Sequence, residues 1–204
     1  MRKLAAFVAL CLVILLAVYS VRRNSEEQVN THLMEADYPI YSSLSTLMAS
    51  STIVIRGTVE RDFAAKRIIP STVKLSELPD WKAKDIGFLM TTIQVHVTDV
   101  IKGEPLLLNN SVLVNQGGGV GGGHTYILKD QPLAKKGNDL LLFLRLLDDG
   151  SYAVVGGPQG RFTIDRETLS SASNSEDVAN LPIVKSIRQS TWDSTKEELL
   201  KNVS

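Results

Sequence analysis

The sequence has 204 residues, of which 44% are hydrophobic, so it suits one ordinary domain with appendages and its composition excludes a wholly disordered chain. Four of the 22 basic residues and none of the 22 acidic ones lie in the first 23 positions, which leaves the remainder with a net charge of −4. A mildly acidic body lacks the basic face that binding to a nucleic-acid backbone requires, so no nucleic-acid partner is expected.

An uncharged apolar run, Leu4–Val21, opens the chain. As a helix its 18 residues would extend about 27 Å, just enough to cross a hydrocarbon core of roughly 30 Å. Arg22-Arg23 ends the run abruptly, which favours an uncleaved anchor, whereas Val18-Tyr19-Ser20 offers the alternative of a cleavage site followed by secretion. The sole cysteine, Cys11, lies inside the run, which excludes a disulfide framework and a cysteine metal site.

The next segment leads from a polar spacer into the first predicted strand. Asn24–Asp37 is typical of a spacer that lifts a domain off the bilayer. Apolar residues at positions i, i+3 and i+4 predict a short helix over Ser42–Ala49, with one face packed against the domain. Thr52–Glu60 alternates as a strand does, and Gly57 interrupts it as at a bulge.

A second strong strand follows a long excursion. Asp62–Phe88 is basic and carries two prolines, so we expect little regular structure apart from a helical turn near Ser76–Trp81. Trp81 either anchors this excursion to the domain or takes part in recognition. Thr91–Ile101 alternates until its phase slips by one residue near Thr98-Asp99, which predicts a second bulge.

Six glycines in seven residues, Gly117–Gly123, separate a predicted strand at Ser111–Gln116 from its hairpin partner at Tyr126–Leu128. No Lys-Ser/Thr follows the glycines and no helix is expected after them, which excludes a Walker loop and a dinucleotide fingerprint. We therefore interpret Gln116–His124 as a flexible hairpin tip whose glycines serve local geometry.

The stretch from Leu140 to Asp165 is the centre of the predicted β domain. Leu140–Leu147 is apolar on both faces except at Arg145, as in a strand covered on two sides. Asp148-Asp149-Gly150 supplies a turn, and Ser151–Val155 returns antiparallel. The Gly156–Gly160 segment, which contains a proline, breaks the ladder before one more strand at Arg161–Asp165.

Residues that suit catalysis or metal binding are few. The guanidinium of Arg145 needs a hydrogen-bond acceptor. Either it pairs within the protein, with Asp99, Asp139 or a backbone carbonyl, or it binds a ligand. The three histidines, His32, His96 and His124, share no metal-ligand spacing. No nucleophile-elbow motif and no separated carboxylate pair occurs, so no catalytic, cofactor-binding or metal-binding residues are assigned.

The last part of the chain predicts a loop and two short helices. Arg166–Asn180 is polar and rich in serine, as in a loop. Leu181–Gln189 carries Pro182 at a first helical position, and Ser194-x-x-Glu197 forms a capping box for a helix over Thr195–Val203. We expect these helices to cover an open end or an edge of the barrel.

Two resemblances add to this interpretation. The chain is similar, over roughly Ser50–Ile164, to a group of uncharacterised extracytoplasmic bacterial proteins, mainly Gram-positive, in the successive segments STIVIRGTVE, TTIQVHVTDVIKGE, VLVNQGGG and DQPLAKKGNDLLLFLRLLDDGSYAVVGGPQGRF. Its strand order also resembles the five-stranded Greek-key barrel of netrin-like and metalloproteinase-inhibitor domains. Those domains carry an N-terminal cysteine and disulfides that this chain lacks, so their inhibitory wedge is not carried over.

The sequence therefore predicts an all-β, OB-like Greek-key barrel of five or six strands with short flanking helices. The expected divisions are a transmembrane segment at residues 1–23, a spacer at 24–40, a barrel domain at 41–170 and a helical appendage at 171–204. The expected function is that of a non-enzymatic, membrane-tethered binding or accessory domain, monomeric, for an envelope protein or glycan; the alternative is a cell-envelope hydrolase. The candidate binding residues are Arg145, Gln116, His124 and Trp81.

We expect the body of the protein to lie outside the cytoplasmic membrane, held there by Leu4–Val21. Protease added to intact cells stripped of their wall should then remove the domain. Full protection of the domain in intact cells, with digestion only after lysis, would contradict this orientation.

Overall fold

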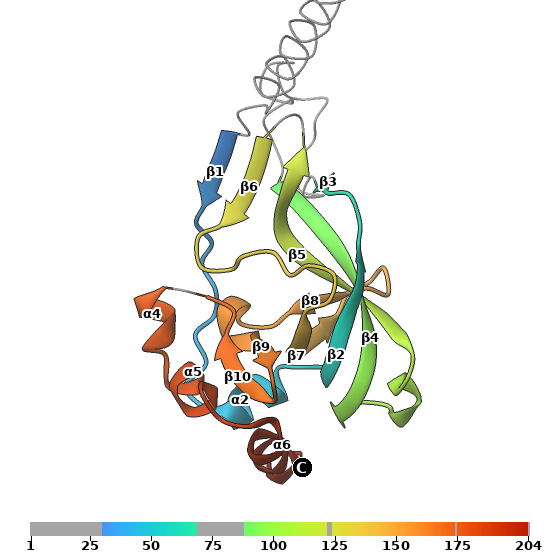
Figure 1. The fold of residues 1–204 in the computed structure, drawn as a ribbon, viewed down its shortest axis with the longest axis vertical. Helices are drawn as coiled ribbons and strands as arrows, with labels where there is room; N and C mark the ends of the chain where they lie inside the picture. Colours follow the sequence, from blue (N-terminus) through green and yellow to red (C-terminus); the bar gives the residue numbers. More distant parts are fainter. Residues whose placement is uncertain (1–29, 69–87, 122–123, 174, 204) are drawn as a thin grey trace, which may run out of the picture.

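The computed structural model describes residues 30–68, 88–121, 124–173 and 175–203, which form a mostly β fold (Figure 1), as the sequence predicts. Its strands are β1 (Asn30–Met34), β2 (Ile53–Asp62), β3 (Lys66–Ile68), β4 (Phe88–Lys102), β5 (Ser111–Gly121), β6 (His124–Leu128), β7 (Asp139–Leu146), β8 (Tyr152–Val154), β9 (Arg161–Asp165) and β10 (Thr168–Ser171). Its helices are α2 (Leu44–Ala49), α4 (Glu176–Ala179), α5 (Pro182–Ile187) and α6 (Trp192–Lys201), with 3-10 turns η2 (Pro105–Leu107) and η3 (Gly157–Gly160).

Five of these strands close into a barrel. β2 lies between β4 and β7 and pairs antiparallel with both, while β4 also pairs with β5 and β7 with β8. The ring closes where β5 and β8 run parallel, through the residue pairs Val114–Tyr152 and Asn115–Ala153. The barrel is therefore closed and mixed, and its parallel seam is short.

The bulge predicted near Thr98-Asp99 is confirmed, and it lies opposite Gly57 in the β2–β4 ladder. Arg56 pairs with Asp99 and Gly57 with Val97, so Thr98 is the extra residue on β4. A Cβ at Gly57 would come within 2.5 Å of the carbonyl oxygen of His96, so the close approach of the two strands requires glycine there. Such a bulge lets long strands bend around a small barrel.

β7 is buried on both faces, as its apolar pattern predicts. Leu140, Leu142 and Leu144 point into the barrel, where they join apolar residues of the other barrel strands. Leu141 and Phe143 point the other way, into a second core built with β9, β10 and the helices. The molecule thus has one core inside the barrel and one on its outer face.

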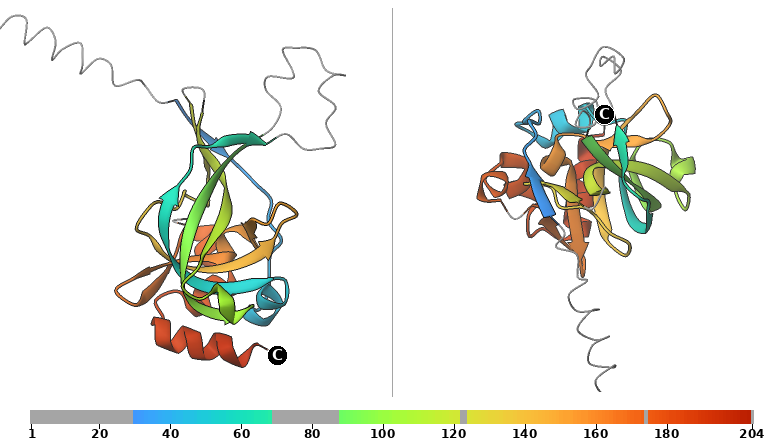
Figure 2. Two further views of the ribbon diagram at one scale, coloured as in Figure 1. Left: turned by 90° about the vertical axis from the view of Figure 1, so that its right-hand side faces the viewer. Right: turned by 90° about the horizontal axis from the view of Figure 1, so that it is seen from above.

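The helices gather at the end of the molecule away from β1 and β6 (Figures 1 and 2). They supply most of the outer core with buried apolar side chains, namely Leu44, Leu47 and Met48 of α2, Val178 of α4, Ile183, Val184 and Ile187 of α5, and Trp192 and Leu199 of α6. The short helix after the spacer and the helix that begins at Pro182 are therefore confirmed. They cover an outer face of the barrel.

Two predictions for the C-terminal part are wrong. The expected loop at Arg166–Asn180 contains β10, which pairs with β9, and the single-turn helix α4. The last helix begins at Trp192 rather than after Ser194, because Thr191 is its N-cap and accepts a hydrogen bond from the backbone N–H of Ser194. The buried Trp192 draws this extra turn into the outer core.

Two segments that were expected to be irregular form strands. Asn30–Met34 of the presumed spacer is β1, which pairs parallel with β6. Residues 117–121 of the presumed hairpin tip continue β5, and residues 118–121 pair with β6. The partner of β1 is distant in sequence, and residues 117–121 are themselves rich in glycine, so neither strand has a recognisable local pattern.

The predicted membrane span and part of the excursion lie outside the described residues. These are Leu4–Val21 and the helical turn near Ser76–Trp81. Within the described ranges, no helix has the length and the apolar character needed to cross a bilayer. The excursion begins with β3, which pairs antiparallel with β4.

The glycines of β5 are not equivalent, and substitution should reveal this. Gly119 has φ +142°, and a Cβ there would collide with the side chains of Ala65 and Thr91, so Gly119→Ala should destabilise the fold by about 1–3 kcal/mol. At Gly121 the added Cβ would meet only the flexible end of Leu89, at 3.1 Å, so Gly121→Ala should cost about 1 kcal/mol or less. Denaturant unfolding of a chain that begins at Asn24 measures both; equal effects would contradict this account.

Phe143 is fully buried in the outer core. Phe143→Ala should lower the free energy of unfolding by about 3–5 kcal/mol, because an aromatic core site is emptied. The matched control is Leu146→Ala on the same strand, where 49% of the side chain is exposed. A loss below about 1 kcal/mol for Phe143→Ala would mean that β7 is not central to the fold.

Candidate functional site

β5 belongs to the barrel only in its first part. Its seam with β8 ends at Asn115, and from Gly118 onward it pairs with β6 instead. β1 adds to β6, so that β1, β6 and residues 118–121 of β5 form a three-stranded arm that projects from the barrel (Figure 1). The local reason is the run of glycines, which lets β5 bend away from the barrel.

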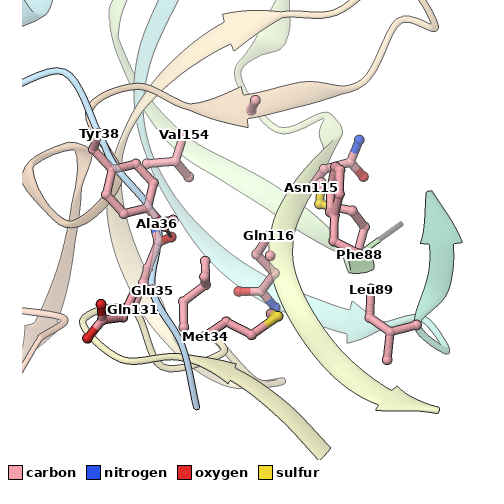
Figure 3. Close-up of a pocket in the computed structure, with 14 residues that line it drawn as sticks. Met34, Glu35, Ala36, Tyr38, Phe88, Leu89, Asn115, Gln116, Gln131 and Val154 are labelled. Atoms are coloured by element: carbon pink, nitrogen blue, oxygen red, sulfur yellow. Dashed lines mark hydrogen bonds between the residues drawn. The ribbon is translucent and has the colours of Figure 1, made fainter. Parts of the chain in front are cut away.

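A cavity of about 420 Å³ lies where the arm and the barrel separate (Figure 3). Its lining is mostly apolar and comes from β1 and the segment after it, from β4, β5 and β8, and from the end of β6: Met34, Glu35, Ala36, Tyr38, Phe88, Leu89, Met90, Asn115, Gln116, Gly117, Leu128, Gln131, Ala153 and Val154. Figure 3 shows Phe88 and Leu89 on one side, Tyr38 and Val154 on the other, and Gln116 and Met34 between them. Met34 and Met90 have flexible side chains that adapt to ligands of different shape.

Gln116, one of the predicted binding residues, lies in the wall of this cavity. Its side-chain amide is buried and hydrogen-bonded: Oε1 accepts from the backbone N–H of Ala134 (2.9 Å), and Nε2 donates to the carbonyl oxygen of the same residue (3.0 Å). Gln116 therefore fastens the segment after β6 to β5. Its Oε1 also accepts a hydrogen bond from Arg161 (3.1 Å).

Arg161 lies directly behind this wall, at the start of β9. Its side chain is 2% exposed and donates to Gln116 Oε1 and to the carbonyl oxygen of Pro132. None of the ion pairs in the described ranges includes Arg161, and its Nε has no hydrogen-bond partner there. Burial lowers the pKa of the guanidinium to about 10, so it stays charged at neutral pH. Arg161 is thus a buried cation that has no counterion in contact with it among the described residues.

Tyr38 stands beside this cation. Its hydroxyl donates to Gln131 Oε1 (3.2 Å), and its ring lies on Gly157, where a Cβ would come within 2.5 Å of the ring. Burial raises the pKa of Tyr38; the charge of Arg161 lowers it, and the smaller effect of Asp130 raises it. Charges of both signs therefore act on the hydroxyl, and the positive one has the larger effect.

Gln159 fixes the segment that carries Tyr38. The buried amide of Gln159 accepts from the backbone N–H of Tyr41 (3.1 Å) and donates to its carbonyl oxygen (2.9 Å). Since β1 holds the other end of the segment on β6, this wall of the cavity is fastened at both ends. The Gly156–Gly160 break that the sequence predicts therefore also supplies the contacts that support the wall.

Arg145 is not among the residues that line this cavity. Arg145 is exposed near the end of β7, and its two expected carboxylate partners pair with other residues: Asp139 with Arg56 (2.7 Å) and Asp99 with Lys196 (2.6 Å). Trp81 lies outside the described residues. The sequence does not single out Arg161 or Tyr38 as site residues. Arg161 is only a polar position at the start of a predicted strand, and no motif includes Tyr38.

His124 lies on the arm and contacts a second histidine. Its Nδ1 lies 2.9 Å from Nε2 of His32, and the His32 ring stacks on Tyr126 at 5.0 Å between centroids. Sequence spacing did not relate these histidines, because 92 residues separate them and only the β1–β6 pairing brings them together. In the described ranges, no group of three or more His, Cys, Asp or Glu side chains is arranged to hold a metal ion.

No protein-family model matches the sequence, and no curated protein matches it. The geometry of the site therefore has to indicate what it can bind. The cavity lining is mostly apolar, and its polar side chains include Tyr38 at one end and Gln116, which is backed by the buried charge of Arg161. Such an arrangement suits binding of an amphipathic molecule.

Proposed function

We propose that this protein is a non-enzymatic binding domain, tethered to the outer face of the cytoplasmic membrane through Leu4–Val21, that takes an apolar group of an envelope component into the cavity. The observation that carries the proposal is the apolar lining between the arm and the barrel. The volume of the cavity, about 420 Å³, falls in the range of small-molecule sites. The resemblance to extracytoplasmic bacterial proteins supports the location and leaves the ligand open.

The finer fold assignment in this proposal is an OB barrel. In chain order the barrel strands are β2, β4, β5, β7 and β8, and their order around the ring is β2-β4-β5-β8-β7. An OB barrel binds ligands through its second and third strands and through the loops after the first and fourth. Here those strands are β4 and β5, which both line the cavity. Because one fold hosts many functions, the cavity itself carries the argument.

The lining favours an apolar group over a bare glycan. Phe88, Met90 and Leu128 offer no hydrogen bonds, so buried sugar hydroxyls would lose their water partners without replacement. The amide of Gln116 is already engaged with Ala134. An acyl chain or a similar apolar group gains from burial in the same place.

A neutral apolar probe tests this function. N-phenyl-1-naphthylamine should bind a chain beginning at Asn24 with a saturable rise in fluorescence, and Ala153→Phe should weaken its binding by about tenfold or more, because the new ring fills the cavity.

The control places the same residue at a site away from the cavity. Leu106→Phe, in η2 where the side chain is 80% exposed, should leave binding unchanged. Thermal melting of each variant checks that it is folded. The proposal is wrong if the probe does not saturate, or if folded Ala153→Phe binds it as the parent chain does.

A further inference from the structure

A cation buried without a counterion is costly, because it has lost water and gained no opposite charge. Arg161 is in this state: it has two hydrogen-bond acceptors, both uncharged, and an Nε without a partner in the described part of the chain. Its neighbours Gln116 and Tyr38 line the cavity. We propose that the cavity takes single-chain amphiphiles with a carboxylate head, with the tail against the apolar lining and the carboxylate at the Tyr38 end, near Gln116 and the charge of Arg161 behind it. This inference rests on the proposed function and names the class of its ligand.

The charges around this end favour a head with one negative charge. Arg161 has the larger electrostatic effect on the Tyr38 hydroxyl, and Asp130 acts on it with the opposite sign. Asp130 also has a buried Oδ1 without a partner in the described ranges. Glu35, at the cavity wall, is paired with Lys129 at 3.6 Å. A monoanionic carboxylate is attracted by the guanidinium, whereas a dianionic phosphate would incur a desolvation cost that grows faster with charge than this attraction does.

The groups at this end also suit a carboxylate in their hydrogen bonding. The Tyr38 hydroxyl is a donor whose present acceptor is a neutral amide oxygen of Gln131, at 3.2 Å. A carboxylate oxygen is a stronger acceptor, since hydrogen bonds to an ionised group are shorter and about twice as strong. The tail then extends toward Met34, Leu89 and Leu128, on the apolar lining. One cavity of about 420 Å³ suits one chain better than the two chains of a membrane phospholipid.

Photolabelling of the full chain in phosphatidylcholine nanodiscs tests the inference. Two probes are compared: a dodecanoic acid with a diazirine in its tail, and the dodecanol with the same diazirine. The acid should label peptides that contain Met34, Leu89 or Leu128 about tenfold more than the alcohol does, and unlabelled dodecanoate should compete. Arg161→Met should remove the preference for the acid, and Arg161→Lys, which keeps a charge, should retain part of it.

Two further variants keep the test decisive if Arg161→Met does not fold. Tyr38→Phe keeps the ring on Gly157 and should reduce labelling by the acid without reducing labelling by the alcohol. Arg145→Met makes the same substitution at an exposed arginine outside the cavity and should change neither labelling by the acid nor labelling by the alcohol. Equal cavity labelling by acid and alcohol in the parent chain would overturn the carboxylate inference and leave the apolar binding function intact. Absence of cavity labelling by both probes would overturn the binding function itself.

Discussion

The structure depends on one strand, β7, that must be hidden from water on both faces. Leu140, Leu142 and Leu144 need an interior on one side, which the closed barrel provides, and Leu141 and Phe143 need a cover on the other. The helices and the β9–β10 hairpin provide that cover. Because both faces of β7 are apolar, the fold needs a core on each side of this strand. This explains why helices and a hairpin cover one outer face of a small barrel.

The cavity follows from the way this barrel closes. The parallel seam between β5 and β8 ends at Asn115, so β5 is free to leave the ring and to form the arm with β6 and β1. The segment after β1 then crosses the gap and supplies Tyr38. Because that segment continues from the N-terminal part of the chain, a wall of the site is also the connection toward the proposed membrane anchor.

The hydrogen bonds of Arg161 contribute to stability, whereas its buried charge is unfavourable for folding. Its hydrogen bonds to Gln116 and to the Pro132 carbonyl oxygen hold the segment after β6 in place, which a neutral side chain could also do. The positive charge strengthens these hydrogen bonds, but it is buried without an ion-pair partner in the described part of the chain, which is unfavourable. Arg56 is in a different environment, because it forms ion pairs with Asp139 and Glu167 and lies over the ring of Trp192. The contrast between the two arginines is the basis for assigning Arg161 to a ligand.

Local patterns in the sequence determined most barrel strands, the bulge at Thr98 opposite Gly57, and the turn at Gly150. They also determined helices α2 and α5. Each of these features depends on residues within a few positions of one another. Gln116, a candidate binding residue from the sequence, lines the cavity, and its binding role stays a prediction. The tertiary structure alone decided the arm, the cavity and the contacts of Arg161. The Tyr38–Gln131 and His32–His124 hydrogen bonds join residues more than 90 positions apart, and no periodicity records such a pairing. Strand β1 and the glycine-rich end of β5 exist because β6 satisfies their backbone groups, and for β1 this partner lies more than 90 positions away. The pairing is a property of the folded chain and not of either segment.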